Sequence, residues 1–229
     1  MTTDWIIYPA TEPVPRFQRP GWPERHERYA ARAAAGPIDL LFLGDSITQR
    51  WEQAPEVWDQ FYGHRRAVAM GIDNDGTQQL LWRLDHANLE GVSPKLVVLL
   101  IGINNIGNDG VEAEELNEGI TAVLAKIREK CPAARVLILG ILPYGQSLHP
   151  GRPETIAETN ARLARLADGE RVHFLDIGAC FLLSDGAVDW TLLHDGVHPS
   201  PAGYEVFAQA IEGKVSELLE EWKGGRLEG

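Results

Sequence analysis

A serine directly after an apolar segment is the first candidate for chemistry in this sequence. Residues 38–43 are apolar except for Asp39, and Gly44, Asp45 and Ser46 follow them. Such a run predicts a buried strand that turns sharply at its carboxyl end, where an open α/β sheet binds its ligands. Ser46 is therefore a candidate nucleophile, provided that a base elsewhere takes its proton. Alternatively, Asp45 and Ser46 cap a helix that begins there.

A candidate base lies near the other end of the chain, in the segment His194-Asp195-Gly196-Val197-His198-Pro199. Asp195 and His198 are three positions apart, so that a turn puts both side chains on one side. An acid there can hold the imidazole in the tautomer whose other nitrogen faces a serine. Two other interpretations remain: an exposed turn, for which these residue types are common, and a metal site formed by His194 and His198. No further group of ligands is visible that would complete such a metal site.

Two polar segments at the ends of predicted strands can stabilise negative charge. Gly102-Ile103-Asn104-Asn105 follows the most apolar run, residues 96–101, and an amide side chain there can donate a hydrogen bond to an oxyanion. The loop from Gly71 to Gly76 can do the same with its backbone N–H groups. Gly and Asn are also ordinary turn residues. Each segment alone is weak evidence, but their occurrence together at strand ends favours a catalytic site.

Strands and helices alternate along the chain. The apolar runs predict strands at residues 38–43, 66–70, 96–101, 135–140 and 172–176. Helical patterns and helix-ending residues predict helices at residues 24–35, 77–88, 112–130, 154–167 and 201–222. This alternation implies a parallel sheet with helices on both faces, the α/β class.

One domain accounts for a chain of 229 residues, which is long enough to bury a substantial core. We expect residues 1–36 to form an N-terminal arm and a helix that pack on this domain. Residues 37–223 are expected to form the domain itself, and residues 224–229 a flexible end.

Charge and composition restrict the partners and the compartment. The 21 basic and 33 acidic residues give a net charge of −12, which argues against binding to nucleic acid or docking on an anionic membrane. No apolar stretch approaches the roughly 20 residues that cross a bilayer, and the N-terminus shows no apolar core of a signal peptide. Two cysteines, Cys131 and Cys180, fit a reducing compartment. We therefore expect a cytoplasmic protein.

Four ordered blocks of this chain resemble the SGNH hydrolases, also called GDSL hydrolases. The blocks span residues 38–200 and are Gly44-Asp45-Ser46, the Gly71 loop, Gly102-x-Asn104 and Asp195-x-x-His198. Three further segments resemble the platelet-activating-factor acetylhydrolase catalytic-subunit type: Leu81-Trp82-Arg83-Leu84, Ile101-Gly102-Ile103-Asn104-Asn105 and Ile141-Leu142-Pro143. The resemblance implies a three-layer α/β/α sandwich with a flavodoxin-like parallel sheet of five strands.

The resemblance also implies roles for the matching positions. Ser46 would be the nucleophile, His198 the general base and then the general acid, and Asp195 the residue that orients His198. The oxyanion hole would consist of the Ser46 N–H, the Asn104 side-chain amide and an N–H from the Gly71 loop. The family type further implies a homodimer, and its chemistry requires no cofactor and no metal.

The Gly71 loop departs from the family pattern. Relatives usually read Gly-Ile-Gly-Gly-Asp-x-Thr where this chain reads Gly71-Ile72-Asp73-Asn74-Asp75-Gly76-Thr77. Asn74 thus takes the place of the glycine whose N–H enters the hole, and Asn tolerates a positive φ better than most residues. The side chains of Asp73 and Asn74 would narrow and polarise the site. This favours a polar acyl acceptor, such as a sugar or a small alcohol, over a bulky lipid.

The predicted function is a serine esterase that removes a short acyl group, most plausibly acetyl, through an acyl-enzyme. One alternative is a thioesterase or lysophospholipase of the same fold. The other is a catalytically weakened binding or assembly module, because an imperfect oxyanion hole lowers the rate without preventing binding. Asp73, Tyr144 and Trp190 are candidate substrate contacts, the last two because they lie on loops near the predicted site.

Overall fold

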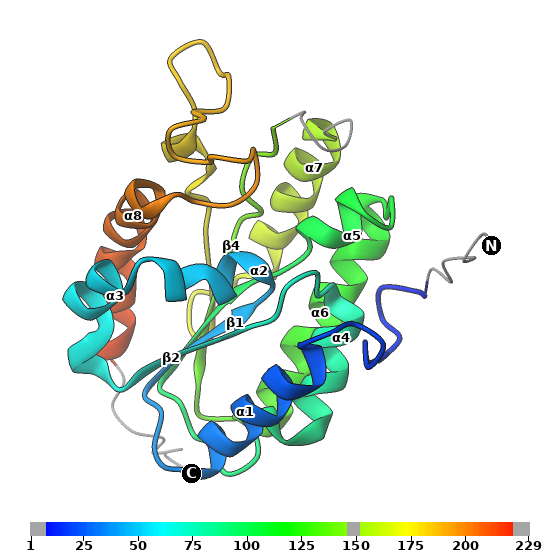
Figure 1. The fold of residues 1–229 in the computed structure, drawn as a ribbon, viewed down its shortest axis with the longest axis vertical. Coiled ribbons are helices and arrows are strands. Elements are labelled where there is room, and N and C mark those ends of the chain that lie inside the picture. The colour runs from blue at the N-terminus through cyan, green and yellow to red at the C-terminus, as the bar shows by residue number, and fades with distance from the viewer. Residues whose placement is uncertain (1–7, 146–151, 222–229) are drawn as a thin grey trace.

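A five-stranded, all-parallel sheet forms the centre of the protein in the computed structural model, which describes residues 8–145 and 152–221 (Figure 1). The strands are β1 (Leu40–Gly44), β2 (Ala67–Gly71), β3 (Leu96–Leu100), β4 (Arg135–Leu139) and β5 (Val172–Leu175). Their order in the sheet is β2-β1-β3-β4-β5, that of flavodoxin-like doubly wound sheets. This confirms the predicted fold class. The predicted flexible end, residues 224–229, lies outside the described residues, as do residues 1–7 of the predicted arm.

Helices cover both faces of the sheet (Figure 1). One face is covered by α1 (Trp22–Ala34), α4 (Thr77–Arg83), α6 (Ala113–Lys130) and α7 (Pro153–Leu163), and the other by α3 (Pro55–Tyr62) and α8 (Pro201–Glu220). Two short helices, α2 (Ser46–Gln49) and α5 (Ile103–Gly107), begin just beyond the ends of β1 and β3. Helices α3 and α5 have no counterpart among the predicted elements. Within the described part of the chain, no helix has the length and apolar character that crossing a membrane requires.

The register of the central strands brings three strand ends to one edge. Gly44, the last residue of β1, pairs with Gly71 of β2 on one side and with Leu100 of β3 on the other. Every residue of β1 and β3 is buried, as expected for parallel strands covered on both faces. The segments that follow Gly44, Gly71 and Leu100 therefore leave the sheet side by side, at the edge where ligands bind in this class of fold.

Residues 8–21 run as an irregular arm across one of these helical layers. Thr77 Oγ1 donates a hydrogen bond to the carbonyl oxygen of Ala10 at 2.6 Å, and the ring of Phe17 meets the ring of Trp82 edge-on with 5.1 Å between centroids. The arm is thus held at the N-terminal end of α4 and on its exposed side.

The end of β2 packs directly against the turn that carries Ser46. A Cβ atom added to Gly71 would lie 2.3 Å from the carbonyl oxygen of Asp45 and 2.3 Å from the backbone nitrogen of Gln49. Because these contacts are backbone atoms, no side-chain rotation can relieve them. Only glycine permits this approach between the two strand ends.

We expect Gly71→Ala to lower the free energy of unfolding by about 3 kcal/mol, because the added methyl group overpacks backbone atoms that cannot move aside. Gly213→Ala is the matched control, since a Cβ at this position in α8 meets nothing within 4 Å. It should raise the free energy of unfolding by about 0.5–1 kcal/mol. Urea denaturation measures both changes. Equal stability of Gly71→Ala and the unaltered protein would contradict the packing described.

Candidate active site

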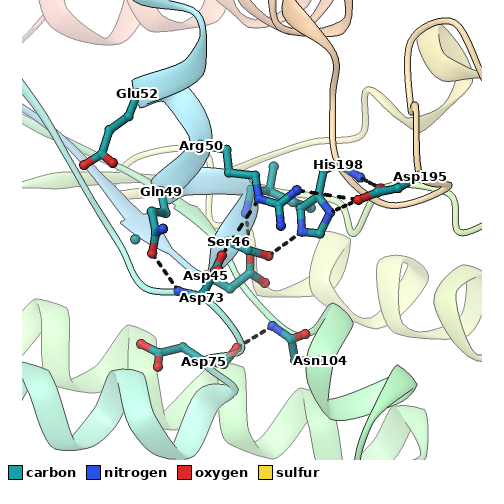
Figure 2. A network of polar contacts seen from close by, with 12 residues as sticks. Asp45, Ser46, Gln49, Arg50, Glu52, Asp73, Asp75, Asn104, Asp195 and His198 are labelled. Atoms are coloured by element: carbon teal, nitrogen blue, oxygen red, sulfur yellow. Dashed lines mark hydrogen bonds and ion pairs between the residues drawn. The ribbon is translucent and has the colours of Figure 1, made fainter. Parts of the chain in front are cut away.

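Ser46, His198 and Asp195 form a continuous chain of hydrogen bonds at the carboxyl edge of the sheet (Figure 2). Ser46 Oγ lies 2.8 Å from His198 Nε2, and His198 Nδ1 lies 2.6 Å from Asp195 Oδ2. The serine and the histidine are 152 positions apart in the sequence. The structure therefore brings together the three side chains that the sequence patterns marked separately.

In the Gly-Asp-Ser turn, Asp45 caps the following helix, whereas Ser46 faces the histidine. Asp45 caps α2, because its Oδ1 accepts a hydrogen bond from the Ile47 N–H at 2.9 Å. Ser46 is the first residue of the helix, and its hydroxyl faces His198 instead. The Asp45 carboxyl is fully buried, and this burial, with smaller contributions from the charges of Asp75 and Asp73, raises its pKa to about 7.

The loop between Asp195 and His198 is a tight turn closed by the aspartate itself. Asp195 Oδ1 accepts hydrogen bonds from the N–H groups of Val197 at 3.0 Å and His198 at 2.8 Å, and Gly196 supplies the positive φ of 82°. The second carboxylate oxygen is thereby left for the imidazole. Partial burial acts to raise the Asp195 pKa, but the hydrogen bonds from His198 and Val197 outweigh it and hold this pKa at about 2.

The surroundings of His198 favour its neutral form, with Nε2 as a hydrogen-bond acceptor. An ionised Asp195 can only accept, so the hydrogen on His198 is assigned to Nδ1, and Nε2 is free to accept from the Ser46 hydroxyl. Burial lowers the pKa of His198 below its usual value of 6.5. The hydrogen bond to Asp195 opposes this shift, whereas the positive charge of Arg50 adds to it.

Arg50 lies between two carboxylates of the site and was not marked by any sequence pattern. Its Nη1 is 3.5 Å from Asp195 Oδ2, and its Nε is 3.9 Å from Asp73 Oδ1 (Figure 2). The only signal in the sequence is its position one helical turn after Ser46, which puts it on the same side of the α2 segment.

In the loop after β2, the N–H of one residue, Asn74, has no hydrogen-bond acceptor among the described residues. Its neighbours all donate within the protein: Ile72 to Gly44 O, Asp73 to Gln49 Oε1, Asp75 to Ile72 O, Gly76 to Gln79 Oε1 and Thr77 to Asn105 Oδ1. Among the described residues, the N–H of Asn74 has no such acceptor. Asn74 has a φ of 63°, the left-handed conformation that its amide side chain tolerates. This N–H is therefore available to a ligand.

The side-chain amide of Asn104 is fixed in orientation at the start of α5. Its Nδ2 donates to the carbonyl oxygen of Asp75 at 2.9 Å, and its Oδ1 accepts from Asn108 Nδ2 at 3.2 Å. One Nδ2 hydrogen remains, and the amide cannot flip without losing both bonds. Asn108 was not singled out from the sequence, although it lies four positions after Asn104 and thus on the same helix face.

A fully buried ion pair holds the loop after β2 in place. Asp75 Oδ2 and Arg83 Nε are 2.8 Å apart, and neither side chain is exposed. Arg83 also donates to the carbonyl oxygens of Met70 and Gly44, each at 3.0 Å, and Trp22 Nε1 donates to Asp75 Oδ1 at 2.7 Å. Burial raises the pKa of Asp75 to about 6 against the opposing charge of Arg83. The sequence feature that corresponds to this buried ion pair is an arginine inside the apolar segment 80–84.

Ser46, His198 and Arg50 open onto a cleft of about 210 Å³. Of the predicted substrate contacts, Asp73 and Tyr144 line it, together with Ser46, Asn74 and Asn104. Trp190 instead lines a neighbouring cleft of about 820 Å³ on the other side of Tyr144.

A metal site at His194 and His198 finds no support in the arrangement of side chains. His194 Nε2 is 4.0 Å from Asp195 Oδ2, and His198 uses both ring nitrogens in the hydrogen bonds to Asp195 and Ser46. In the part of the chain that the structure describes, no three His, Cys, Asp or Glu side chains gather closely enough to hold a metal ion.

Comparison with known proteins agrees with this geometry. Residues 42–206 match the model of the GDSL-like lipase/acylhydrolase family. Human platelet-activating factor acetylhydrolase IB subunit alpha1 is 35% identical over 219 residues, which cover 94% of this chain and 93% of the relative. The alpha2 subunit of the same enzyme from Gallus gallus is 32% identical over 200 residues, covering 87% of this chain and 86% of the relative.

Solved structures share the fold. A GDSL-like lipase from Bacteroides thetaiotaomicron superimposes with a TM-score of 0.71 at 22% identity, covering 84% of this chain and 97% of that one. The carbohydrate acetylesterase Est24 from Sinorhizobium meliloti gives a TM-score of 0.62 at 20% identity, covering 79% of this chain and 99% of that one. The family match and the curated relatives confirm the resemblance first seen in the sequence. The chain therefore belongs to the GDSL-like lipase/acylhydrolase family and is an ester hydrolase.

Proposed function

We propose that the protein is a serine esterase that hydrolyses short-chain esters, above all acetyl esters, through an acyl-enzyme. The observation that supports this most is the hydrogen-bonded chain from Ser46 through His198 to Asp195, which opens into the same cleft as two unused donors. Those donors are the Asn74 N–H and the second Nδ2 hydrogen of Asn104. A nucleophile, a base, an orienting acid and oxyanion donors around one cleft are the parts that acyl transfer requires.

The first half of the reaction forms the acyl-enzyme. Ser46 Oγ attacks the ester carbonyl carbon while its proton passes to His198 Nε2, and the imidazolium that results is stabilised by Asp195. The carbonyl oxygen becomes an oxyanion, which accepts hydrogen bonds from the N–H groups of Ser46 and Asn74 and from Asn104 Nδ2. When the tetrahedral species collapses, the bond to the alcohol oxygen breaks and His198 gives its proton to the leaving alcohol.

The second half returns the enzyme to its starting state. Water gives a proton to His198 Nε2 and attacks the acyl carbon, so that the oxyanion forms again in the same hole. Collapse breaks the bond to Ser46 Oγ, which takes back the proton from His198, and the carboxylic acid leaves. Asp195, with its low pKa, stays ionised throughout.

The preference for a short acyl group rests on the size and lining of the cleft. At about 210 Å³ the cleft is small, and the polar side chains of Asp73 and Asn74 form part of its wall. Extending an acyl chain against such groups would remove them from water without partners, which is unfavourable. The relatives named acetylhydrolases, up to 35% identical, support the same preference. A sugar or a small alcohol stays the predicted acyl acceptor.

Other features stay predictions. These are a cytoplasmic location, a homodimer, residues 37–223 as the hydrolase domain, and the absence of nucleic-acid and membrane partners. A thioesterase or lysophospholipase activity and a weakened binding module stay as alternatives.

We expect Ser46→Ala to lower kcat for p-nitrophenyl acetate by about a thousandfold or more, because the nucleophile is removed. A fluorophosphonate probe should label the unaltered protein and leave Ser46→Ala unlabelled. Ser184→Ala, at an exposed serine, is the control and should be labelled and active like the parent. Hydrolysis by Ser46→Ala at the original rate would refute the mechanism, and an unlabelled parent protein would favour the binding module.

We expect kcat/KM for p-nitrophenyl esters to be highest for acetyl and to fall steadily towards decanoyl, because the cleft is small and its wall is polar. Steady-state kinetics over the series, below the concentration at which the long esters form micelles, measures this trend. Faster turnover of the long-chain esters would favour a lysophospholipase instead.

We expect kcat/KM to fall on acidification with a midpoint below pH 6.5. Only neutral His198 accepts the serine proton, so activity is lost as the pH falls through the pKa of His198. This pKa is lowered from its usual value mainly by burial. A pH profile in buffers of constant ionic strength tests this, and a midpoint at pH 7 or above would show that the environment of His198 is not the one described.

A further inference from the structure

Asn74 has an unfavourable backbone conformation, and its N–H must also point in one direction. Its φ of 63° lies in the left-handed region, which is unfavourable for a residue other than glycine. Its N–H must nevertheless keep one direction if it is to meet an oxyanion, because such donors act through being held in place beforehand. The backbone on either side is fixed by the hydrogen bond from Asp73 N–H to Gln49 and by the Asp75–Arg83 ion pair. Asn74 itself can be held only through its side chain.

The N-terminal arm supplies a partner for that side chain. With the Asn74 amide turned so that its oxygen faces the arm, this oxygen lies 2.6 Å from Arg19 Nη2 and 3.2 Å from Arg19 Nη1. The opposite orientation offers only Asn108 Nδ2 at 3.3 Å. The turned amide loses the hydrogen bond from Asn108 and places two Nδ2 donors 3.3 Å apart. Two hydrogen bonds from a charged guanidinium outweigh this loss, which favours the orientation in which the amide oxygen faces Arg19.

Arg19 is itself anchored next to the loop that it contacts. Its N–H donates to the carbonyl oxygen of Arg16 at 2.9 Å, and its own carbonyl oxygen accepts from the Trp22 N–H at 3.1 Å. Trp22 then reaches Asp75 through its ring nitrogen. The arm and the first residue of α1 thus contact two successive residues of the loop after β2, through Arg19 at position 74 and through Trp22 at position 75.

We propose that Arg19 is a positioning residue for the oxyanion hole: it holds the Asn74 side chain so that the Asn74 N–H stays directed into the cleft. The proposal rests on the proposed function, in which this N–H meets the oxyanion. A glycine at position 74 offers no side chain to hold, so the role of Arg19 exists only because this chain has Asn there. Arg19 does not line the catalytic cleft among the residues described, and its effect is therefore on the rate and not on substrate binding.

A double-mutant cycle tests the proposal in the full chain. We expect Arg19→Ala to lower kcat for p-nitrophenyl acetate about three- to tenfold with KM unchanged, the size of one typical net hydrogen bond. In the Asn74→Gly background the same substitution should leave kcat unchanged, because the partner of Arg19 is gone. Arg19→Lys keeps one donor and should fall between Arg19→Ala and the parent. Arg28→Ala, at an exposed arginine of α1, is the control and should match the parent.

Three outcomes would overturn the proposal. These are an unchanged kcat in Arg19→Ala, an equal loss of kcat in both backgrounds, and a change confined to KM or to the midpoint of thermal unfolding, which is measured for all variants. The last would assign Arg19 a purely structural or substrate-binding role. Failure of the proposed function looks different, since Ser46→Ala would then keep its activity whatever residue stands at position 19.

Discussion

The buried ion pair between Asp75 and Arg83 joins the segments from which the active site is built. Two charges removed from water are tolerated only when each is paired and its remaining hydrogen-bonding groups are satisfied. Arg83 meets this condition by donating to the ends of β1 and β2, and Asp75 meets it through Trp22. Displacing the loop after β2 would leave a charge unpaired in the core. The position of Asn74 and, through the Asp75 carbonyl oxygen, that of Asn104 follow from this constraint.

Four aspartates surround the site at which we propose that an oxyanion forms. Asp45, Asp73, Asp75 and Asp195 all lie near Ser46 (Figure 2), and unpaired carboxylates there would oppose an oxyanion. The negative charge of each one is reduced by a positively charged partner or by burial. Asp75 is paired with Arg83, Asp73 and Asp195 share Arg50, and burial raises the pKa of Asp45 to about 7, which disfavours its charged form. The site thus has less negative charge than its residue types suggest.

A structural feature could be predicted from the sequence where residues close together in the chain determine it. The strands could be predicted because burial on both faces makes each one an apolar run, and Ser46, Asp195 and His198 stand in short segments with their own spacing. Helix α5 could not be predicted, because its Asn and Gly residues have low helix propensity. Tertiary contacts, such as the hydrogen bond from the Thr77 N–H to Asn105, stabilise it instead. The pairing of Arg19 with Asn74 likewise joins distant segments, which no local pattern records.

The 152-residue separation of Ser46 from its base gives the order in which the site can form during biosynthesis. The turn carrying Ser46 is complete early in the growing chain, whereas His198 follows near its end and is placed by the docking of α8. Tyr204 of that helix donates to the Ile47 carbonyl oxygen at 2.6 Å. Contacts so far apart in sequence form late, because closing the intervening loop is entropically costly. A nascent chain therefore carries Ser46 without its hydrogen-bond partner, and the cleft is complete only once the segment around His198 has docked.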